Sequence, residues 1–71
     1  MTQNKIQVFI NGKKKLLEKN KNLIEVLKLL KITKSGIAIE MNSAVVPKSQ
    51  YVNTFVKDND RIEIVQFIGG G

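Results

Sequence analysis

Two short segments joined by an Asn-Gly pair limit the fold of this chain more than any other feature of its sequence. The segment "KIQVFI" (5–10) alternates with the period of a β-strand, and its apolar members share one face: Ile6, Val8 and Ile10. Asn11-Gly12 follows, and both residue types accept the positive φ that a two-residue hairpin turn requires. The segment "KKKLLEK" (13–19) then returns, with lysines that suit a sheet edge. The pattern predicts an antiparallel hairpin.

A single helix is expected after the hairpin. Asn22, with Glu25 three residues later, is typical of a capping box at a helix N-terminus. Behind it, apolar residues recur at the spacing of one helical stripe: Leu23, Val26, Leu27 and Leu30. The stripe predicts a helix that packs on the sheet, and "TKSG" (33–36) is expected to close it.

The second half of the chain predicts three more strands. "GIAIEM" (36–41) alternates, with Ala38 and Glu40 facing outward, and "AVV" (44–46) is a short strand halted by Pro47. An irregular segment follows, in which Tyr51 and Phe55 are expected to anchor the chain to the core. "RIEIVQF" (61–67) is the last strand, with Ile62 and Ile64 facing inward and Arg61, Glu63, Val65 and Phe67 outward.

This order predicts an α+β fold with one helix on one face of a mixed sheet of four to five strands. The last strand is expected beside the first, parallel to it, in the centre of the sheet. That arrangement is the ubiquitin-like β-grasp. The predicted organisation is a β-grasp domain over residues 1–67 and a flexible C-terminal glycine tail over residues 68–71.

Composition argues against most enzyme and metal chemistry. The 71 residues include no cysteine and no histidine, which removes thiol nucleophiles, Ser-His pairs and the usual zinc ligands. Asp58 and Asp60 lie in a turn signal, where aspartate is expected for structural reasons. The prediction is therefore no catalytic residue, no metal and no cofactor. With no long apolar run and no signal-peptide pattern near Met1, a cytoplasmic protein without membrane association is expected.

The formal net charge of +6 raises the possibility of nucleic-acid binding. Eleven of the twelve basic residues are lysines scattered along the chain, and Arg61 alone offers a bidentate donor. The aromatic residues also lie far apart in sequence, whereas stacking on bases needs aromatics clustered among basic residues. A nucleic-acid-binding module is therefore disfavoured but stays open as an alternative.

A partner-binding patch is predicted on the sheet face opposite the helix. Alternation places four apolar side chains there: Phe9, Ala38, Val65 and Phe67. Because the last strand is expected in the sheet centre, these side chains should adjoin, and small domains seldom leave such a patch unused. Phe67 also leads directly into the glycine tail.

The sequence finishes on "IGGG", with Gly69, Gly70 and Gly71 as the predicted tail. A carboxylate does not react until ATP converts it to an acyl-adenylate, so a carboxylate that carries a group needs an activating enzyme. Only glycine lets a backbone pass where any Cβ would clash. The tail therefore predicts that the Gly71 carboxylate is adenylated within a narrow enzyme site.

Three stretches carry a resemblance to a known family: "VFINGK", "IAIEMNSAVVPKSQY" and "DNDRIEIVQFIGGG". Together they resemble the ThiS family, the sulfur carriers of thiamine biosynthesis within the ubiquitin-like superfamily. The resemblance implies that a ThiF-like adenylyltransferase activates Gly71 and that sulfur from a cysteine desulfurase-linked donor turns it into a thiocarboxylate. A ThiG-like thiazole synthase would then take the sulfur. It implies a carrier and co-substrate, monomeric when free, and not an enzyme.

Two related families remain as alternatives with the same fold and tail. One is the MoaD-like small subunit of molybdopterin synthase, and the other is the ubiquitin-related protein modifiers. The stretch "MNSAVVPKSQ" and the short chain favour the ThiS family over the MoaD-like subunit, and the protein modifiers are the third alternative.

Overall fold

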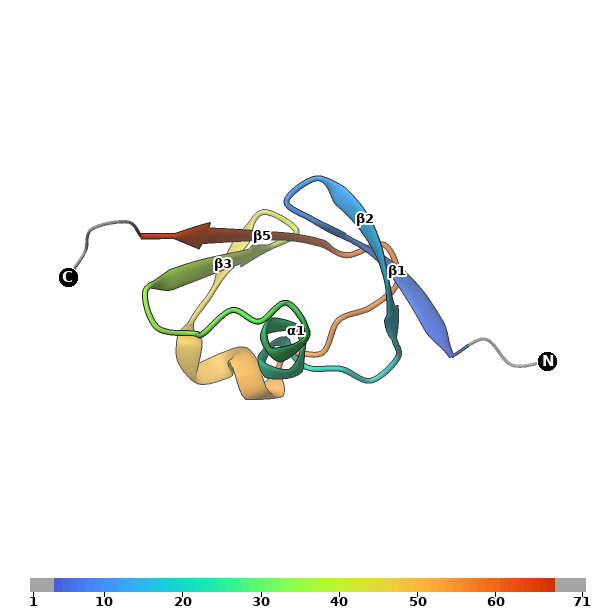
Figure 1. Cartoon of the computed structure of the whole chain (residues 1–71), viewed down its shortest axis with the longest axis horizontal. Helices are drawn as coiled ribbons and strands as arrows, with labels where there is room; N and C mark the ends of the chain where they lie inside the picture. Colours follow the sequence, from blue (N-terminus) through green and yellow to red (C-terminus); the bar gives the residue numbers. More distant parts are fainter. Residues whose placement is uncertain (1–3, 68–71) are drawn as a thin grey trace.

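The structure is a computed structural model, and it describes residues 4–67. Five strands, one α-helix and one 3-10 helix follow one another in these residues (Figure 1). In chain order they are β1 (Lys5–Ile10), β2 (Lys13–Glu18), α1 (Leu23–Leu29), β3 (Ile37–Met41), β4 (Ala44–Val46), the 3-10 helix η1 (Lys48–Asn53) and β5 (Arg61–Gln66).

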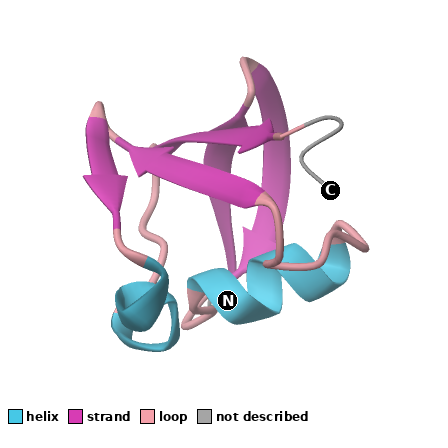
Figure 2. Cartoon of the chain, turned by 90° about the vertical axis from the view of Figure 1, so that its left-hand side faces the viewer, coloured by secondary structure: helices cyan, strands magenta, loops and turns pink. Residues whose placement is uncertain are grey.

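The strands form one mixed sheet in the order β2-β1-β5-β3-β4. Strand β5 lies in the centre and runs parallel to β1, whereas the other neighbouring pairs are antiparallel. Both helical segments lie on one side of the strands, as Figure 2 shows. The predicted β-grasp arrangement, with the last strand parallel to the first at the sheet centre, is confirmed.

The core lies between α1 and the inward face of the sheet. Leu23, Val26 and Leu27 of the predicted stripe are buried, whereas Leu30 is only partly buried at the end of the helix. They meet the alternate side chains of the central strands, of which Val8, Ile39 and Ile62 are the most deeply buried: their exposed fractions are 0%, 0% and 1%. The helix phase and the strand faces predicted from alternation are therefore confirmed.

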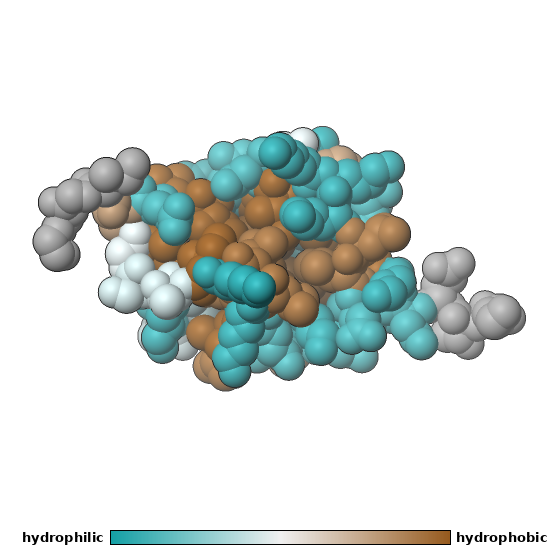
Figure 3. All heavy atoms as spheres, viewed as in Figure 1, coloured by the Kyte–Doolittle hydropathy of each residue, from teal (hydrophilic) through white to brown (hydrophobic). Residues whose placement is uncertain are grey.

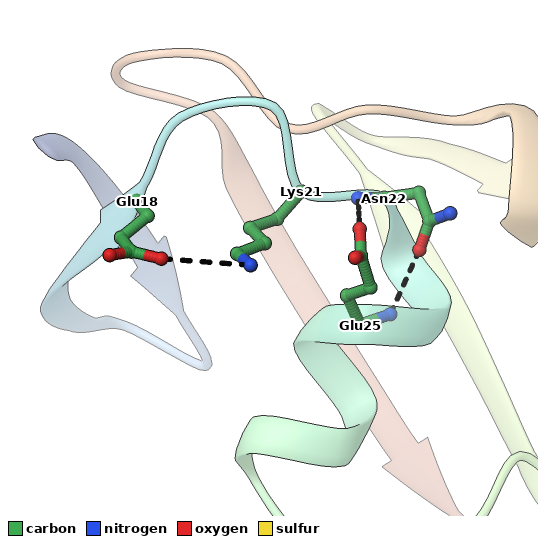
Figure 4. A network of polar contacts seen from close by, with 4 residues as sticks. All are labelled: Glu18, Lys21, Asn22 and Glu25. Atoms are coloured by element: carbon green, nitrogen blue, oxygen red, sulfur yellow. Dashed lines mark hydrogen bonds and ion pairs between the residues drawn. The ribbon is translucent and has the colours of Figure 1, made fainter. Parts of the chain in front are cut away.

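The helix begins at the predicted capping box (Figure 4). The Asn22 side chain accepts a hydrogen bond from the Glu25 backbone N–H at 2.9 Å, and the Glu25 carboxylate accepts one from the Asn22 N–H at 2.9 Å. The Asn22 amide also donates to the Val52 carbonyl at 3.1 Å, which ties the helix start to η1. Just before the cap, Lys21 and Glu18 form an ion pair at 3.6 Å.

The helix ends earlier than the "TKSG" segment. Lys31 adopts a left-handed conformation with φ of 60°, a conformation that glycine usually supplies at this position. Its N–H donates to the Lys28 carbonyl at 3.1 Å, and the Ile32 N–H donates to the Leu27 carbonyl at 2.9 Å. This double closure is a Schellman motif, which brings Ile32 back toward Leu27.

The segment before β5 corrects one expectation. Tyr51 is buried with 1% exposure, as predicted, but Phe55 is 49% exposed and does not anchor the chain; Val56 does, with 4% exposure. The reason is a short extended stretch pinned to the helix entry by two hydrogen bonds, Leu23 N–H to Thr54 C=O and Val56 N–H to Lys21 C=O. In extended backbone, successive side chains point in opposite directions, so burial of Val56 turns Phe55 outward.

Burial also changes the acidity of the one tyrosine. Removal from water raises the pKa of the Tyr51 phenol above its ordinary value of 10.0, and a hydrogen bond with the backbone of Ile39 offsets part of the rise.

Candidate docking surface and the end of strand β5

The sheet face opposite α1, called the outer face below, is open along the central strand. Alternation along β5 turns Arg61, Glu63 and Val65 to this face, because Ile62 and Ile64 are buried on the helix side. With β5 between β1 and β3, its outward side chains lie in the middle of the face.

The side chain of Asn11 helps to hold β5 in this central place. Its Oδ1 accepts a hydrogen bond from the Ile64 N–H at 2.7 Å, and its Nδ2 donates to the Ile64 carbonyl at 3.2 Å. The carboxamide therefore acts as an extra peptide group and continues the β1–β5 ladder past the point where β1 turns away. The Asn-Gly signal predicted the turn but not this second role, because the partner is more than fifty residues away in sequence.

Three of the four predicted patch residues come together at the C-terminal end of β5. Ala38 of β3 is directly opposite Val65, and the Phe67 N–H donates to the Gly36 carbonyl at 2.8 Å, which extends this pairing by one step. Val65 and Phe67 are 52% and 60% exposed, and Ala38 is half-buried. We call Ala38, Val65 and Phe67 the β5-end cluster.

Phe9 does not join this cluster. Its register partner on β5 is Arg61, and the guanidinium carbon lies 5.1 Å from the centre of the Phe9 ring, a cation–π contact. Four residues separate Arg61 from Val65, which corresponds to about 13 Å along a strand. The expectation that all four side chains adjoin was therefore wrong for Phe9, because alternation predicts the face of a residue and not its level along the sheet.

Two carboxylates lie between Phe9 and the β5-end cluster. Glu63 and Glu40 are direct partners across β5 and β3, an arrangement of like charges that repel each other across the sheet. Val45 on β4 is directly opposite Glu40 and is 69% exposed. Sequence reasoning did not include Val45 in the patch, since a strand of three residues is too short to show alternation. The middle of the outer face is thus acidic, with apolar side chains beside it.

Asp58 and Asp60 have structural partners in the turn before β5. Asp58 accepts a hydrogen bond from the Gln7 N–H at 2.8 Å. Asp60 accepts from the Lys57 N–H at 2.7 Å and from the Asn42 side chain at 2.9 Å. These contacts fix the approach of β5 to β1 and β3. Both aspartates therefore have a structural role in the turn. Within residues 4–67, no three histidine, cysteine, aspartate or glutamate residues gather in a way that could hold a metal ion.

The predicted tail residues Gly69, Gly70 and Gly71 lie outside the described residues, and the last described residue is Phe67 of the β5-end cluster. Over the part of the chain that the structure describes, none of the helices has the length and apolar character needed to cross a membrane.

Known proteins resemble this chain in sequence and in structure. The ThiS family matches residues 3–71. The sulfur carrier protein ThiS of Escherichia coli is 29% identical over 93% of this chain and 100% of its own length. The crystal structure of a thiamine biosynthesis protein (ThiS) from Geobacter metallireducens is 30% identical, covers 93% of this chain and 100% of that chain, and superposes with a TM-score of 0.80.

A thiazole synthase of Paramagnetospirillum magneticum is 36% identical over 93% of this chain. The chain spans only 20% of the length of that protein. The family match covers nearly the whole chain, and the structural likeness covers 93% of it. The resemblance predicted from the sequence motifs is confirmed. The chain belongs to the ThiS family, the sulfur carriers of thiamine biosynthesis.

Proposed function

We propose that this protein carries sulfur as a thiocarboxylate on Gly71. A ThiF-like adenylyltransferase activates the carboxylate, a cysteine desulfurase-linked donor supplies the sulfur, and a ThiG-like thiazole synthase consumes it. The protein is a carrier and co-substrate, monomeric when free and working in the cytosol, where ATP is available. The chemistry is carried out by its partners and not by groups of its own.

The carboxylate must be activated because its oxygen is a poor leaving group. A carboxylate oxygen of Gly71 attacks the α-phosphorus of ATP, a new P–O bond forms, and pyrophosphate leaves. A sulfide equivalent then attacks the acyl carbon, the C–O bond to AMP breaks, and a thiocarboxylate remains. The net change in the carrier is one oxygen replaced by one sulfur.

The observation that carries the proposal is the position of the β5-end cluster. Val65 of β5 and Phe67, one residue beyond the end of β5, are exposed apolar side chains that immediately precede residues 68–71 in the sequence. A partner that holds this cluster therefore holds the carrier within a few residues of Gly71. The three glycines suit a narrow path to the nucleotide, since a residue without a Cβ passes where others clash.

The thiazole synthase from P. magneticum supports a ThiG-like partner. A segment similar to this chain is part of that longer polypeptide, so a carrier-like domain and the remaining four-fifths of the protein are held together covalently. Covalent connection of this kind raises the effective concentration of one part near the other. We propose that the same two activities meet here.

The substitution Gly70→Val tests the proposal. The chain is incubated with ATP, a ThiF-like enzyme and a sulfur source, and its mass is measured. The unchanged protein is expected to gain about 16 Da. The valine variant is expected to stay at its starting mass, because a branched Cβ next to the reacting group blocks the path. Misplacement of the reacting atoms by about 1 Å slows a step about a hundredfold.

The matched control is Ala44→Val, which enlarges an exposed side chain on β4 and is expected to react normally. Both variants should melt like the unchanged protein. If Gly70→Val gains sulfur at the normal rate, the glycines have no role in activation and the proposed mechanism is wrong.

A further inference from the structure

A second surface, on the opposite side of the sheet from the β5-end cluster, combines apolar side chains with lysines. It consists of three hollows of about 320, 320 and 230 Å³ around the C-terminal end of α1. Two of them share Lys15 and Leu30 in their linings, and Ile32 is shared with the third, so the three hollows adjoin one another and make up one surface. We call it the lysine-rimmed groove.

Apolar side chains from the helix end form the floor of this groove. Leu29 is 57% exposed, while Leu30 and Ile32 are partly buried and pack against the core. The left-handed Lys31 turns the chain so that Ile32 returns beside Leu27, which continues the apolar surface past the last turn of the helix. Figure 3 shows a band of apolar surface across the middle of this side of the molecule, with hydrophilic side chains above and below it.

The rim of the groove is strongly basic. Six of the eleven lysines of the chain line the three hollows: Lys5, Lys13, Lys15, Lys21, Lys28 and Lys34. Glu18 is the one carboxylate in these linings, and it is paired with Lys21 at 3.6 Å. Within residues 4–67 the other five lysines have no carboxylate within ion-pair distance. The groove therefore presents uncompensated positive charge around apolar surface.

We propose that the lysine-rimmed groove docks an acidic amphipathic segment of a partner protein, one with apolar side chains along one face and carboxylates on both flanks. Apolar side chains enter the hollows over Leu29, Leu30 and Ile32, and the carboxylates meet the lysines, as in the binding of an amphipathic helix to a groove. This site is separate from the outer face, and the proposal holds whether or not Gly71 carries sulfur.

The shape and chemistry of the groove favour this occupant over three others. A second copy of the chain would offer the two carboxylates Glu40 and Glu63 on its outer face, together with Arg61, against the six lysines of the rim. A bilayer binds apolar side chains that protrude, whereas this surface is hollowed and receives a convex segment. Proteins that bind single-stranded nucleic acids stack bases on aromatic side chains in addition to holding the phosphates, and the linings of the three hollows contain no aromatic residue.

The test uses the full chain labelled with ¹⁵N and a synthetic amphipathic helical peptide, with leucines on one face and glutamates on its flanks. Amide shifts are expected at Leu29, Leu30 and Ile32, with affinity falling as salt increases. A peptide with every glutamate changed to glutamine should bind at least about tenfold more weakly, since it retains the apolar face and loses the charges.

A pair of charge-reversed proteins separates the groove from general electrostatics. Lys13→Glu with Lys15→Glu places two reversed charges on the rim and should lower the affinity for the acidic peptide about tenfold or more. Lys48→Glu with Lys57→Glu makes the same change of net charge outside the three hollows and should lower it far less. Lys28→Glu, on the helix instead of the edge strand, is expected to repeat the first result if the hairpin variant folds poorly.

Three outcomes would overturn the proposal. One is no binding of the acidic peptide, or shifts that map to the outer face. Another is an equal loss of affinity in both charge-reversed pairs, which would show a general effect of charge. The third is tighter binding at the groove by phosphatidylserine vesicles or a single-stranded oligonucleotide than by the peptide, which would identify a phosphate-bearing occupant.

Discussion

The outer face and the lysine-rimmed groove both expose apolar side chains, yet the charges next to these side chains differ. In the middle of the outer face, Glu40 and Glu63 lie directly opposite each other, and Val65 is next in line along β5. In the groove, Leu29 and Ile32 are surrounded by lysines. The two surfaces lie on opposite sides of one sheet, and the β5-end cluster has carboxylates beside it where the groove has lysines.

This difference shows why the net charge of +6 is a poor guide to what the protein binds. The positive charge is concentrated around the groove, and β-strand alternation turns Glu40 and Glu63 to the other side of the sheet. A domain of this size can thus offer surfaces of different chemistry on its two sides. Which surface a partner uses then depends on the charge around the apolar contact as well as on the apolar contact itself.

Both surfaces depend on the packing of α1 against the sheet, and Leu27→Ala should break them together. Leu27 is 2% exposed, so its truncation leaves a cavity and should lower the free energy of unfolding by about 2–5 kcal/mol. Leu29→Ala is the matched control: this leucine, two positions along the same helix, is 57% exposed and should change stability by about 0.5 kcal/mol or less. Urea unfolding measures both, and equal losses would contradict the helix phase.

The next largest effect concerns the outer face alone. Phe67→Asp should weaken binding to a ThiF-like enzyme about tenfold or more, because it places a charge in the β5-end cluster. Phe9→Asp should have a smaller effect, since Phe9 lies opposite Arg61 at the other end of the face. Isothermal titration measures both affinities. Equal losses of affinity in the two variants would mean that the partner surface includes Phe9 after all. A change in acidic-peptide binding in either variant would mean that the two surfaces are not independent.

The smallest expected effect is on the pH dependence of stability, which reports on buried Tyr51 in the core between the two surfaces. The pKa of Tyr51 is raised in the folded state, so the unfolded chain loses this proton first as pH rises. The contribution of the neutral phenol to stability is therefore complete below about pH 10 and declines as pH rises from there toward the folded pKa. Thermal melts at pH 9 and pH 11 should show a larger drop for the unchanged protein than for Tyr51→Phe. An identical drop in both would assign the alkaline loss to other groups.

Local patterns in the sequence predicted the fold well because each one reflects short-range physics. The capping box joins Asn22 and Glu25, three positions apart, and the helical stripe follows from 3.6 residues per turn. The faces of Ile6 and Ile64 follow from the two-residue period of a strand. The family motifs were equally visible in the sequence. The ubiquitin-like fold and the ThiS family were both predicted correctly on these grounds.

The buried anchor is Val56 and not the predicted Phe55, which shows where such patterns fail. Both residues are apolar and the stretch around them has no regular period. Their directions were decided by hydrogen bonds to Lys21 and Leu23, more than thirty residues earlier in the chain. A contact between residues so far apart in the sequence cannot be predicted from the local pattern.

By itself, the sequence determined the elements, their faces and the family, because those depend on neighbours within a few residues. Only the tertiary structure decided the register between strands. That register placed Phe9 beside Arg61, paired Glu40 with Glu63, made Asn11 a partner of Ile64 and gathered distant lysines around the end of α1. The physical reason is that register depends on the sum of packing and hydrogen bonds across the whole sheet. Each strand alone is compatible with several registers.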